Sequence, residues 1–122
     1  LESPVINGDG NYSRDFTYID NVIQANLLSL VTTNKKAINT VYNVAYGDRN
    51  TLNDLMIYLK EYLSEFDAEI SSVEVIYGPN RVGDIPHSHA SVNKAKELLN
   101  YNPQFSLQKG LKEAVSWYWK NL

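Results

Sequence analysis

Apolar residues recur along the first half of the chain at spacings typical of helices. An i, i+4, i+7, i+8 pattern follows Asp20, a residue suited to cap a helix, and predicts one apolar helix face: Ile23, Leu27, Leu30 and Val31. A longer stripe over residues 52–66 predicts a second helix. Thr51 and Asp54 precede it at the spacing of a capping box, so this helix has a defined start.

The second half of the chain predicts two more helices, with short strands between the helical segments. Ser91 is placed to cap a short helix, and Ser106 a last helix whose apolar face is expected to be buried: Leu107, Leu111, Val115, Tyr118 and Leu122. Segments 40–45 and 72–77 are rich in β-branched residues and predict strands, while residues 3–19 predict short extended pieces around a glycine turn. The sequence therefore predicts a small α/β fold of about four helices and two to three short strands.

Composition and charge narrow the class of protein. The 122 residues, 43% of them hydrophobic, suit one domain spanning residues 1–122. A net charge of −3 without a basic patch disfavours nucleic-acid binding, and the lack of cysteine excludes thiolate sites. There is no membrane-length apolar run and no signal-peptide pattern, so we expect a cytoplasmic protein without a membrane partner. The chain lacks an initiator Met, and we expect it to be part of a longer protein.

Three arginines are the strongest candidates for chemistry. Arg14, Arg49 and Arg81 each lie in a predicted loop or strand end close to an Asp, whereas the lysines fall mostly on predicted helices. A guanidinium group offers a planar fork of donors that suits phosphate. Local ion pairing within turns is the alternative for each arginine. Glycines close to Arg14 and Arg81 favour an anion site for these two, because glycine lets the backbone approach a ligand.

Other polar and aromatic groups predict less. His87 and His89 are the only histidines, and a zinc site needs three or four ligands, so we expect no metal and ordinary packing roles for both. The Gly8-Asp9-Gly10 stretch lacks the third glycine of a dinucleotide loop, which favours a tight turn. Trp117 and Trp119 flank Tyr118, so at least one of the two is expected to cover another surface.

Three blocks of the sequence, in order, resemble one family. INGDGNYSRDFTYIDNVIQANLLSL is similar to the GxGxxxRDFxYVxD segment of nucleotide-sugar epimerases and dehydratases, which are extended short-chain dehydrogenase/reductase enzymes. VYNVAYGDRNTLNDLMIYL resembles the next block, and RVGDIPHSHASVNKAKELLNYNPQFSLQKGLKEAVSWY resembles the closing RxGDxxxSxADxxKA block. The nearest likeness within the family is to bacterial UDP-N-acetylglucosamine 4-epimerases.

The resemblance implies roles for particular residues. Arg14 and Arg81 correspond to arginines that reach the substrate diphosphate, and Asp84 to a carboxylate that accepts from ribose hydroxyls. The extended piece before the glycine turn corresponds to the backbone along the uracil: Val5, Ile6 and Asn7. Ser88 matches a position that limits the room around the sugar 2-substituent, where a small residue leaves space for an N-acetyl group. The expected substrates are therefore UDP-GlcNAc and UDP-GalNAc.

The family's remaining signatures are not in this sequence. There is no GxxGxxG loop for NAD and no YxxxK pair for proton transfer, so no catalytic residue is predicted. We expect the substrate-binding domain of a longer NAD-dependent 4-epimerase, separated from its N-terminal Rossmann domain. By itself this piece is expected to be inactive and to self-associate through exposed apolar surface. A UDP-glucuronate epimerase or decarboxylase, a dTDP-sugar dehydratase, and a non-catalytic binding module remain alternatives.

Overall fold

Four helices and four short strands make up the protein, which confirms the α/β class and the number of helices. The structure is a computed structural model that describes residues 1–122. The bounds of its helices are as follows: α1 Ile19–Val31, α2 Leu52–Ser64, α3 Asn93–Leu99 and α4 Leu107–Asn121, with short 3-10 helices η1 Lys35–Ala37 and η2 Ala68–Ser72. The strands are β1 Val5–Asn7, β2 Ser13–Arg14, β3 Asn50–Thr51 and β4 Ile76–Gly78.

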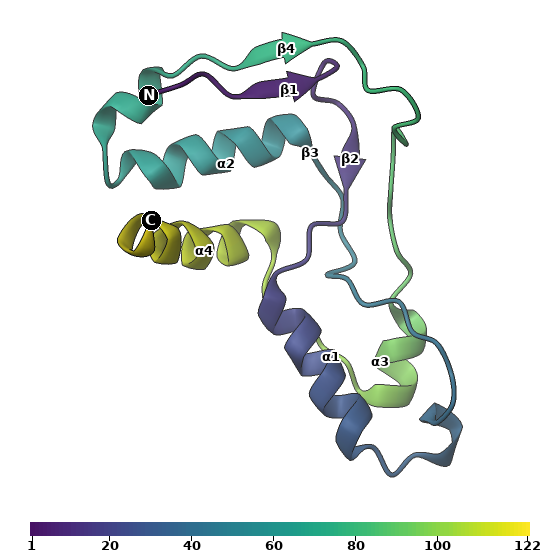
Figure 1. Ribbon diagram of the computed structural model, residues 1–122. Coiled ribbons are helices and arrows are strands. Elements are labelled where there is room, and N and C mark those ends of the chain that lie inside the picture. The colour runs from purple at the N-terminus through teal and green to yellow at the C-terminus, as the bar shows by residue number, and fades with distance from the viewer.

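The elements form two lobes that meet at an angle (Figure 1). In the sheet lobe, β1 pairs parallel with β4, α2 lies beside this pair, and α4 packs along the other side of α2. The helical lobe contains α1, η1 and α3. Its core is a cluster of five buried residues: Ala25, Ala45, Val92, Ala95 and Tyr101. Neither lobe is thick, because each has only two or three layers of packed elements.

Strand β2 lies where the two lobes meet. It pairs antiparallel with β3, with Ser13 opposite Thr51 and Arg14 opposite Asn50. On its other side Ser13 forms a parallel bridge with His87. The segment between β4 and α3 is therefore fastened to β2 in the middle of its length, and the residues of two distant sequence blocks meet there.

The helix starts follow the sequence signals in two of four cases. Thr51 caps α2 in a complete capping box with Asp54, and Ser106 accepts a hydrogen bond from the Lys109 backbone N–H at the start of α4, as predicted. The predictions for Asp20 and Ser91 were wrong. Asp20 lies in the first turn of α1, after Tyr18, where its charge still suits the helix dipole, and α3 begins after Val92 without a side-chain cap.

Two predicted strands differ from the structure. Residues 40–45 form no strand, although the Tyr101 hydroxyl donates to the Ala45 carbonyl oxygen and the Tyr42 hydroxyl to that of Ala37. Of the predicted strand 72–77, only Ile76 and Tyr77 pair, because η2 extends to Ser72. β-branched residues favour an extended chain, but a strand also needs a neighbouring strand to pair with. The fold provides one to Ile76 and none to residues 40–45.

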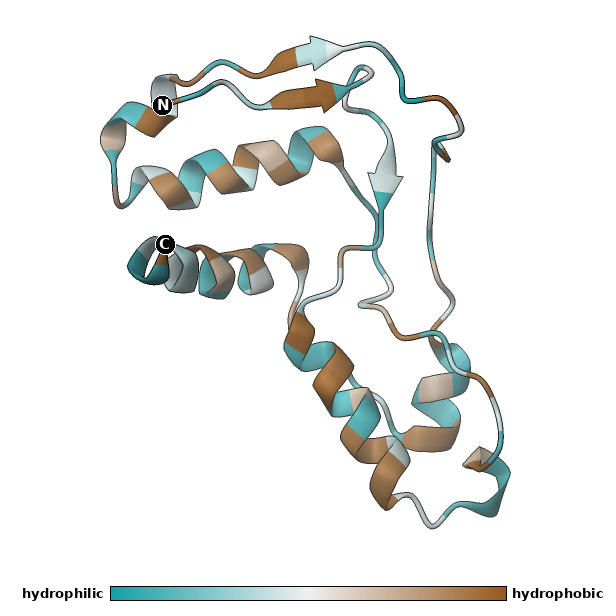
Figure 2. Cartoon of the chain, in the orientation of Figure 1, coloured by the Kyte–Doolittle hydropathy of each residue, from teal (hydrophilic) through white to brown (hydrophobic).

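The apolar face predicted for α1 points to solvent in this structure. Its residues are between 45% and 82% exposed: Ile23, Leu27, Leu30 and Val31. Figure 2 shows the dense apolar colouring of this helix. The buried face instead carries Asn21 and Ala25. The Asn21 side chain donates to the Phe105 carbonyl oxygen and accepts from the backbone N–H groups of Gln104 and Phe105, so polar contacts set the rotation of α1.

The last turn of α4 is also exposed. Trp117 and Trp119 are 59% and 45% exposed, consistent with the expectation that one of them covers another surface. Tyr118 and Leu122, which were predicted to be buried, are exposed as well. Trp119 stacks on Phe66 with ring centroids 5.3 Å apart. No helix combines the length and apolar content needed to cross a bilayer.

The total accessible surface is large for a chain of this mass. It measures 8,286 Å², whereas a compact monomer of 13.9 kDa exposes about 6,700 Å². The difference of about 1,600 Å² exceeds the roughly 800 Å² that one partner contributes to a standard protein interface. The chain is therefore less compact than an ordinary monomer of its mass, and many of its large apolar side chains are exposed.

Candidate functional site

Arg14 and Asp84 form the central contact of the candidate site. Arg14 extends from β2, and one of its terminal nitrogens lies 2.5 Å from a carboxylate oxygen of Asp84, which is 70 positions later in the sequence. The other terminal nitrogen of Arg14 donates to the Ser13 carbonyl oxygen. The two side chains are 29% and 26% exposed, so the pair is partly buried but open to a ligand. The fold thus joins two of the residues that the sequence singled out.

Arg81 begins the turn that delivers Asp84. The backbone N–H of Asp84 donates to the Arg81 carbonyl oxygen, and Gly83 occupies the third position with a φ of +79°. A type II turn requires this conformation, which glycine adopts without strain. Arg81 is exposed and forms no ion pair. One positive group is therefore paired with Asp84, and a second stands free three residues before it.

Strand β1 ends beside this turn. A Cβ on Gly8 would lie 2.2 Å from the Asn80 side-chain oxygen, so the residue before Arg81 contacts the end of β1. Val5 and Asn7 have exposed side chains, whereas Ile6 is buried and offers only its backbone to a ligand. The β1–β4 sheet has two strands, so β1 keeps one unpaired edge of backbone N–H and C=O groups.

The glycine turn is the tight turn that the sequence predicted. Gly8 and Gly10 both have positive φ, and Asp9 accepts from the backbone N–H and the side-chain amide of Asn11. The backbone hydrogen bond from Asn11, followed by the one from its side chain, lowers the pKa of Asp9. The turn joins β1 to β2, not a strand to a helix, so it does not fit the pyrophosphate of a dinucleotide.

Ser88 and both histidines lie against β2. The Ser88 backbone N–H donates to the Ser13 carbonyl oxygen, and the Ser88 side chain is exposed. His87 Nδ1 lies 2.9 Å from Ser13 Oγ, and His89 Nδ1 lies 3.7 Å from a carboxylate oxygen of Asp15. From the sequence, ordinary packing roles were expected for the histidines, and their partners were not predicted. The alternation His-Ser-His opposite Ser-Arg-Asp was the signal that could have found them.

Asp15 is the most buried charged side chain at the site, with 5% of its side chain exposed. Both of its carboxylate oxygens accept from the Gly47 backbone N–H, at 3.1 and 3.2 Å. Burial is the main cause that raises the pKa of the Tyr101 hydroxyl, and the nearby charge of Asp15 adds to it. Asp15 therefore ties β2 to the segment that precedes β3.

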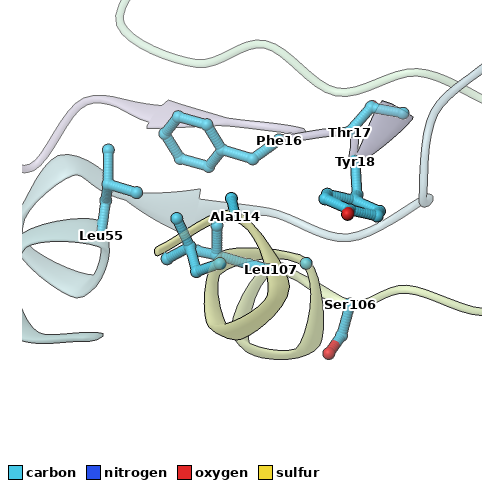
Figure 3. Close-up of a pocket in the computed structure, with 9 residues that line it drawn as sticks. Phe16, Thr17, Tyr18, Leu55, Ser106, Leu107 and Ala114 are labelled. Carbon is cyan, nitrogen blue, oxygen red and sulfur yellow. The ribbon is translucent and has the colours of Figure 1, made fainter. Parts of the chain in front are cut away.

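No group of three or more His, Cys, Asp or Glu side chains is placed to hold a metal ion. An apolar cavity of about 210 Å³ lies elsewhere, between the segment after β2 and helices α2 and α4. Figure 3 shows its lining, in which Phe16, Leu55 and Leu107 take part. This cavity contains none of the predicted site residues. Chemically, the candidate site offers a guanidinium group that can bind an anion, next to a carboxylate that can accept from hydroxyl groups.

Comparison with known proteins gives extensive matches. Residues 1–114 match the family described as GDP-mannose 4,6 dehydratase. A putative UDP-glucose 4-epimerase from Methanocaldococcus jannaschii is 33% identical over 120 residues, which cover 98% of this chain and 35% of that protein. The chain spans about a third of the length of the curated relatives that it matches.

Solved structures share the fold. The UDP-glucose 4-epimerase from Thermotoga maritima, solved with UDP-glucose, is 39% identical with a TM-score of 0.83, and the match covers 98% of this chain and 35% of that one. A UDP-N-acetylglucosamine 4-epimerase from Methanobrevibacter ruminantium, in complex with UDP-N-acetylmuramic acid, is 34% identical with a TM-score of 0.84, covering 99% of this chain and 36% of that one. Other solved relatives hold both NAD and a UDP-sugar.

Proposed function

The chain belongs to the GDP-mannose 4,6 dehydratase family, as its resemblance to nucleotide-sugar epimerases and dehydratases indicated, and from this premise we propose that it binds a UDP-sugar. Residues 1–122 would act as one substrate-binding domain of an NAD-dependent 4-epimerase. The observation that carries the proposal is the meeting of Arg14, Asp84 and the Arg81 turn, which contacts the end of β1 through Asn80. Relatives that are UDP-sugar 4-epimerases support the reaction class.

Each site residue has a role that its placement suits. Arg14 and Arg81 grip the diphosphate, because two guanidinium groups match a doubly charged anion. Asp84 accepts hydrogen bonds from ribose hydroxyls while it holds Arg14. The uracil lies along β1, where exposed Val5 and Asn7 and the free backbone edge complement a flat base with alternating donors and acceptors. Ile6 contributes its backbone alone, since its side chain is buried.

For the sugar, we propose that the substrates are UDP-GlcNAc and UDP-GalNAc. Ser88 is small and exposed on the segment that follows Asp84, so it leaves room for an N-acetyl group. The related N-acetylglucosamine epimerase supports this choice. UDP-glucuronate epimerases and a UDP-N-acetylglucosaminuronate decarboxylase among the relatives keep those reactions as the second candidate.

NAD would be held by another part of the full-length protein. The glycine turn of residues 8–10 links two strands and does not fit a dinucleotide, and no tyrosine here is followed by lysine four positions later. NAD supplies hydride transfer at the sugar when it is bound. The domain that carries it is the natural cover for the exposed face of α1, and the 122-residue chain alone should not epimerise.

Titration of the full-length protein tests the proposal. UDP-GlcNAc should bind to the wild-type protein, and the Arg81→Ala variant should lose about 2 kcal/mol or more of binding free energy. Ser88→Tyr should weaken UDP-GlcNAc turnover while UDP-glucose turnover is retained, because a bulky side chain fills the space for the N-acetyl group. Equal affinity of wild type and Arg81→Ala would overturn the diphosphate assignment. A non-catalytic module would bind without turnover even when NAD is supplied.

A further inference from the structure

The two histidines face one residue of β2, Ser13, and the residue that follows β2, Asp15, in matching order. His87 Nδ1 lies 2.9 Å from Ser13 Oγ, and His89 Nδ1 lies 3.7 Å from Asp15 Oδ2. The backbone repeats this order, because Ser13 forms a parallel bridge with His87, donates from its N–H to the Pro86 carbonyl oxygen and accepts from the Ser88 N–H. The segment His87-Ser88-His89 therefore lies alongside Ser13-Arg14-Asp15 residue by residue.

Alternation along paired strands separates these residues into two sets. Side chains at positions i and i+2 share a face, while the residue between them points to the opposite one. The two histidines, Ser13 and Asp15 consequently meet on one face. Arg14 and Ser88, the proposed diphosphate and sugar contacts, belong to the other face. A shift of one residue in this pairing would exchange the faces.

The β2 side of this contact is firmly held. Only 5% of the Asp15 side chain is exposed, and its carboxylate accepts a hydrogen bond from the Gly47 backbone N–H. Ser13 is buried and is opposite Thr51 in the pairing with β3. The segment that carries the histidines is less well held, since Val82 and Ile85 on it are 99% and 63% exposed. Contacts with β2 thus decide where this segment sits.

We propose that His87 and His89 are positioning residues that fix the register of the segment against β2. They act through Ser13 and Asp15, and they set where Ser88 stands relative to Arg14. The inference rests on the proposed function for its effect on ligand binding, but the register itself is a property of the fold. The proposed role of the histidines involves no contact with the substrate.

The test uses full-length protein and alanine variants of each histidine. We expect about fivefold weaker UDP and UDP-GlcNAc binding for His87→Ala, the factor that one lost hydrogen bond of about 1 kcal/mol gives. His89→Ala should have a smaller effect because its contact is longer, and the double variant a larger one than either. Both contacts use Nδ1, and asparagine places an amide near that position. His87→Asn should therefore restore binding to within about twofold of wild type.

A second measurement follows the register without any ligand. The Ser88 amide, which donates to Ser13, should exchange its hydrogen faster in His87→Ala than in wild type or His87→Asn, and Ser13→Ala should add nothing to His87→Ala. Failure of wild-type protein to bind any UDP compound would sink the proposed function while leaving this exchange result standing. Unchanged Ser88 exchange in His87→Ala, or equal losses in the alanine and asparagine variants, would overturn the positioning role.

Discussion

Replacing Arg14 with alanine separates a contribution to folding from a contribution to binding. Arg14 pairs with Asp84 at 2.5 Å and bonds the Ser13 carbonyl oxygen, so the variant loses contacts even in the free protein. If the residue were only structural, stability would fall and ligand affinity would follow it. If it grips a diphosphate, affinity should fall by much more than stability.

The magnitudes follow from exposure. The paired side chains are 29% and 26% exposed, which places them between a surface pair worth 0–1 kcal/mol and a buried one. We expect Arg14→Ala to lower the free energy of unfolding by about 1 kcal/mol. Loss of an arginine that contacts a desolvated diphosphate costs about 2–5 kcal/mol, so UDP affinity should fall at least about 30-fold.

The assay combines calorimetric titration of UDP with urea denaturation of full-length protein. Lys112→Ala is the matched control, since it also removes one positive charge from an ion pair, here 3.9 Å from Glu65 on a distant helix pair. It should leave UDP affinity within about twofold. Adding Asp84→Asn to Arg14→Ala should recover part of the stability by removing an unpaired carboxylate. UDP affinities of Arg14→Ala and Lys112→Ala that agree within error would refute the assignment.

Three further predictions concern the rest of the chain. Tyr101→Phe should lower unfolding free energy by about 1–2 kcal/mol and Tyr42→Phe by less in urea denaturation, because both hydroxyls donate to carbonyl oxygens but only that of Tyr101 is buried. The pKa of Asp54 is lowered first by the hydrogen bond from the Thr51 side chain and then by the one from the Thr51 backbone N–H. The stability that the Asp54 carboxylate contributes is present above the unfolded-state pKa near 3.8 and is lost as the pH falls below that value. Thr51→Ala should therefore cost about 1 kcal/mol at pH 7 and weaken the acid dependence below about pH 4; an unchanged pH profile would contradict this. The 122-residue chain should self-associate in sedimentation and Leu27→Lys should reduce it, whereas a wild-type monomer at high concentration would contradict the exposed α1 face as a docking surface.

Local signals in the sequence were sufficient for the starts of two of the four helices. Thr51 with Asp54, and Ser106, fixed the starts of α2 and α4, because a cap acts on backbone groups within its own first turn. The tight turn at Gly8–Gly10 was predicted for the same reason, since the tolerance of positive φ is a property of glycine itself. Such features need no knowledge of what the chain packs against.

Local signals in the sequence did not predict how α1 is rotated about its own axis. Its periodic apolar residues predicted an apolar face, and Asn21, which makes three hydrogen bonds with residues more than 80 positions away, turns that face outward. Periodicity shows that a face is apolar but not which surface covers it. Residues 40–45 fail as a strand for the same reason, as pairing depends on a neighbour that the sequence of the segment does not specify.

At the site, the sequence singled out Arg14, Asp84 and Arg81 by residue type and by resemblance. Their grouping is a tertiary result: the Arg14–Asp84 pair closes across 70 positions, and the ladder of His87 and His89 on Ser13 and Asp15 follows from one bridge on β2. The sequence by itself determined which side chains have the charge and shape to hold a nucleotide diphosphate. Only the fold decided which of them meet, because hydrogen bonds and ion pairs act over a few ångströms, whatever the distance along the chain.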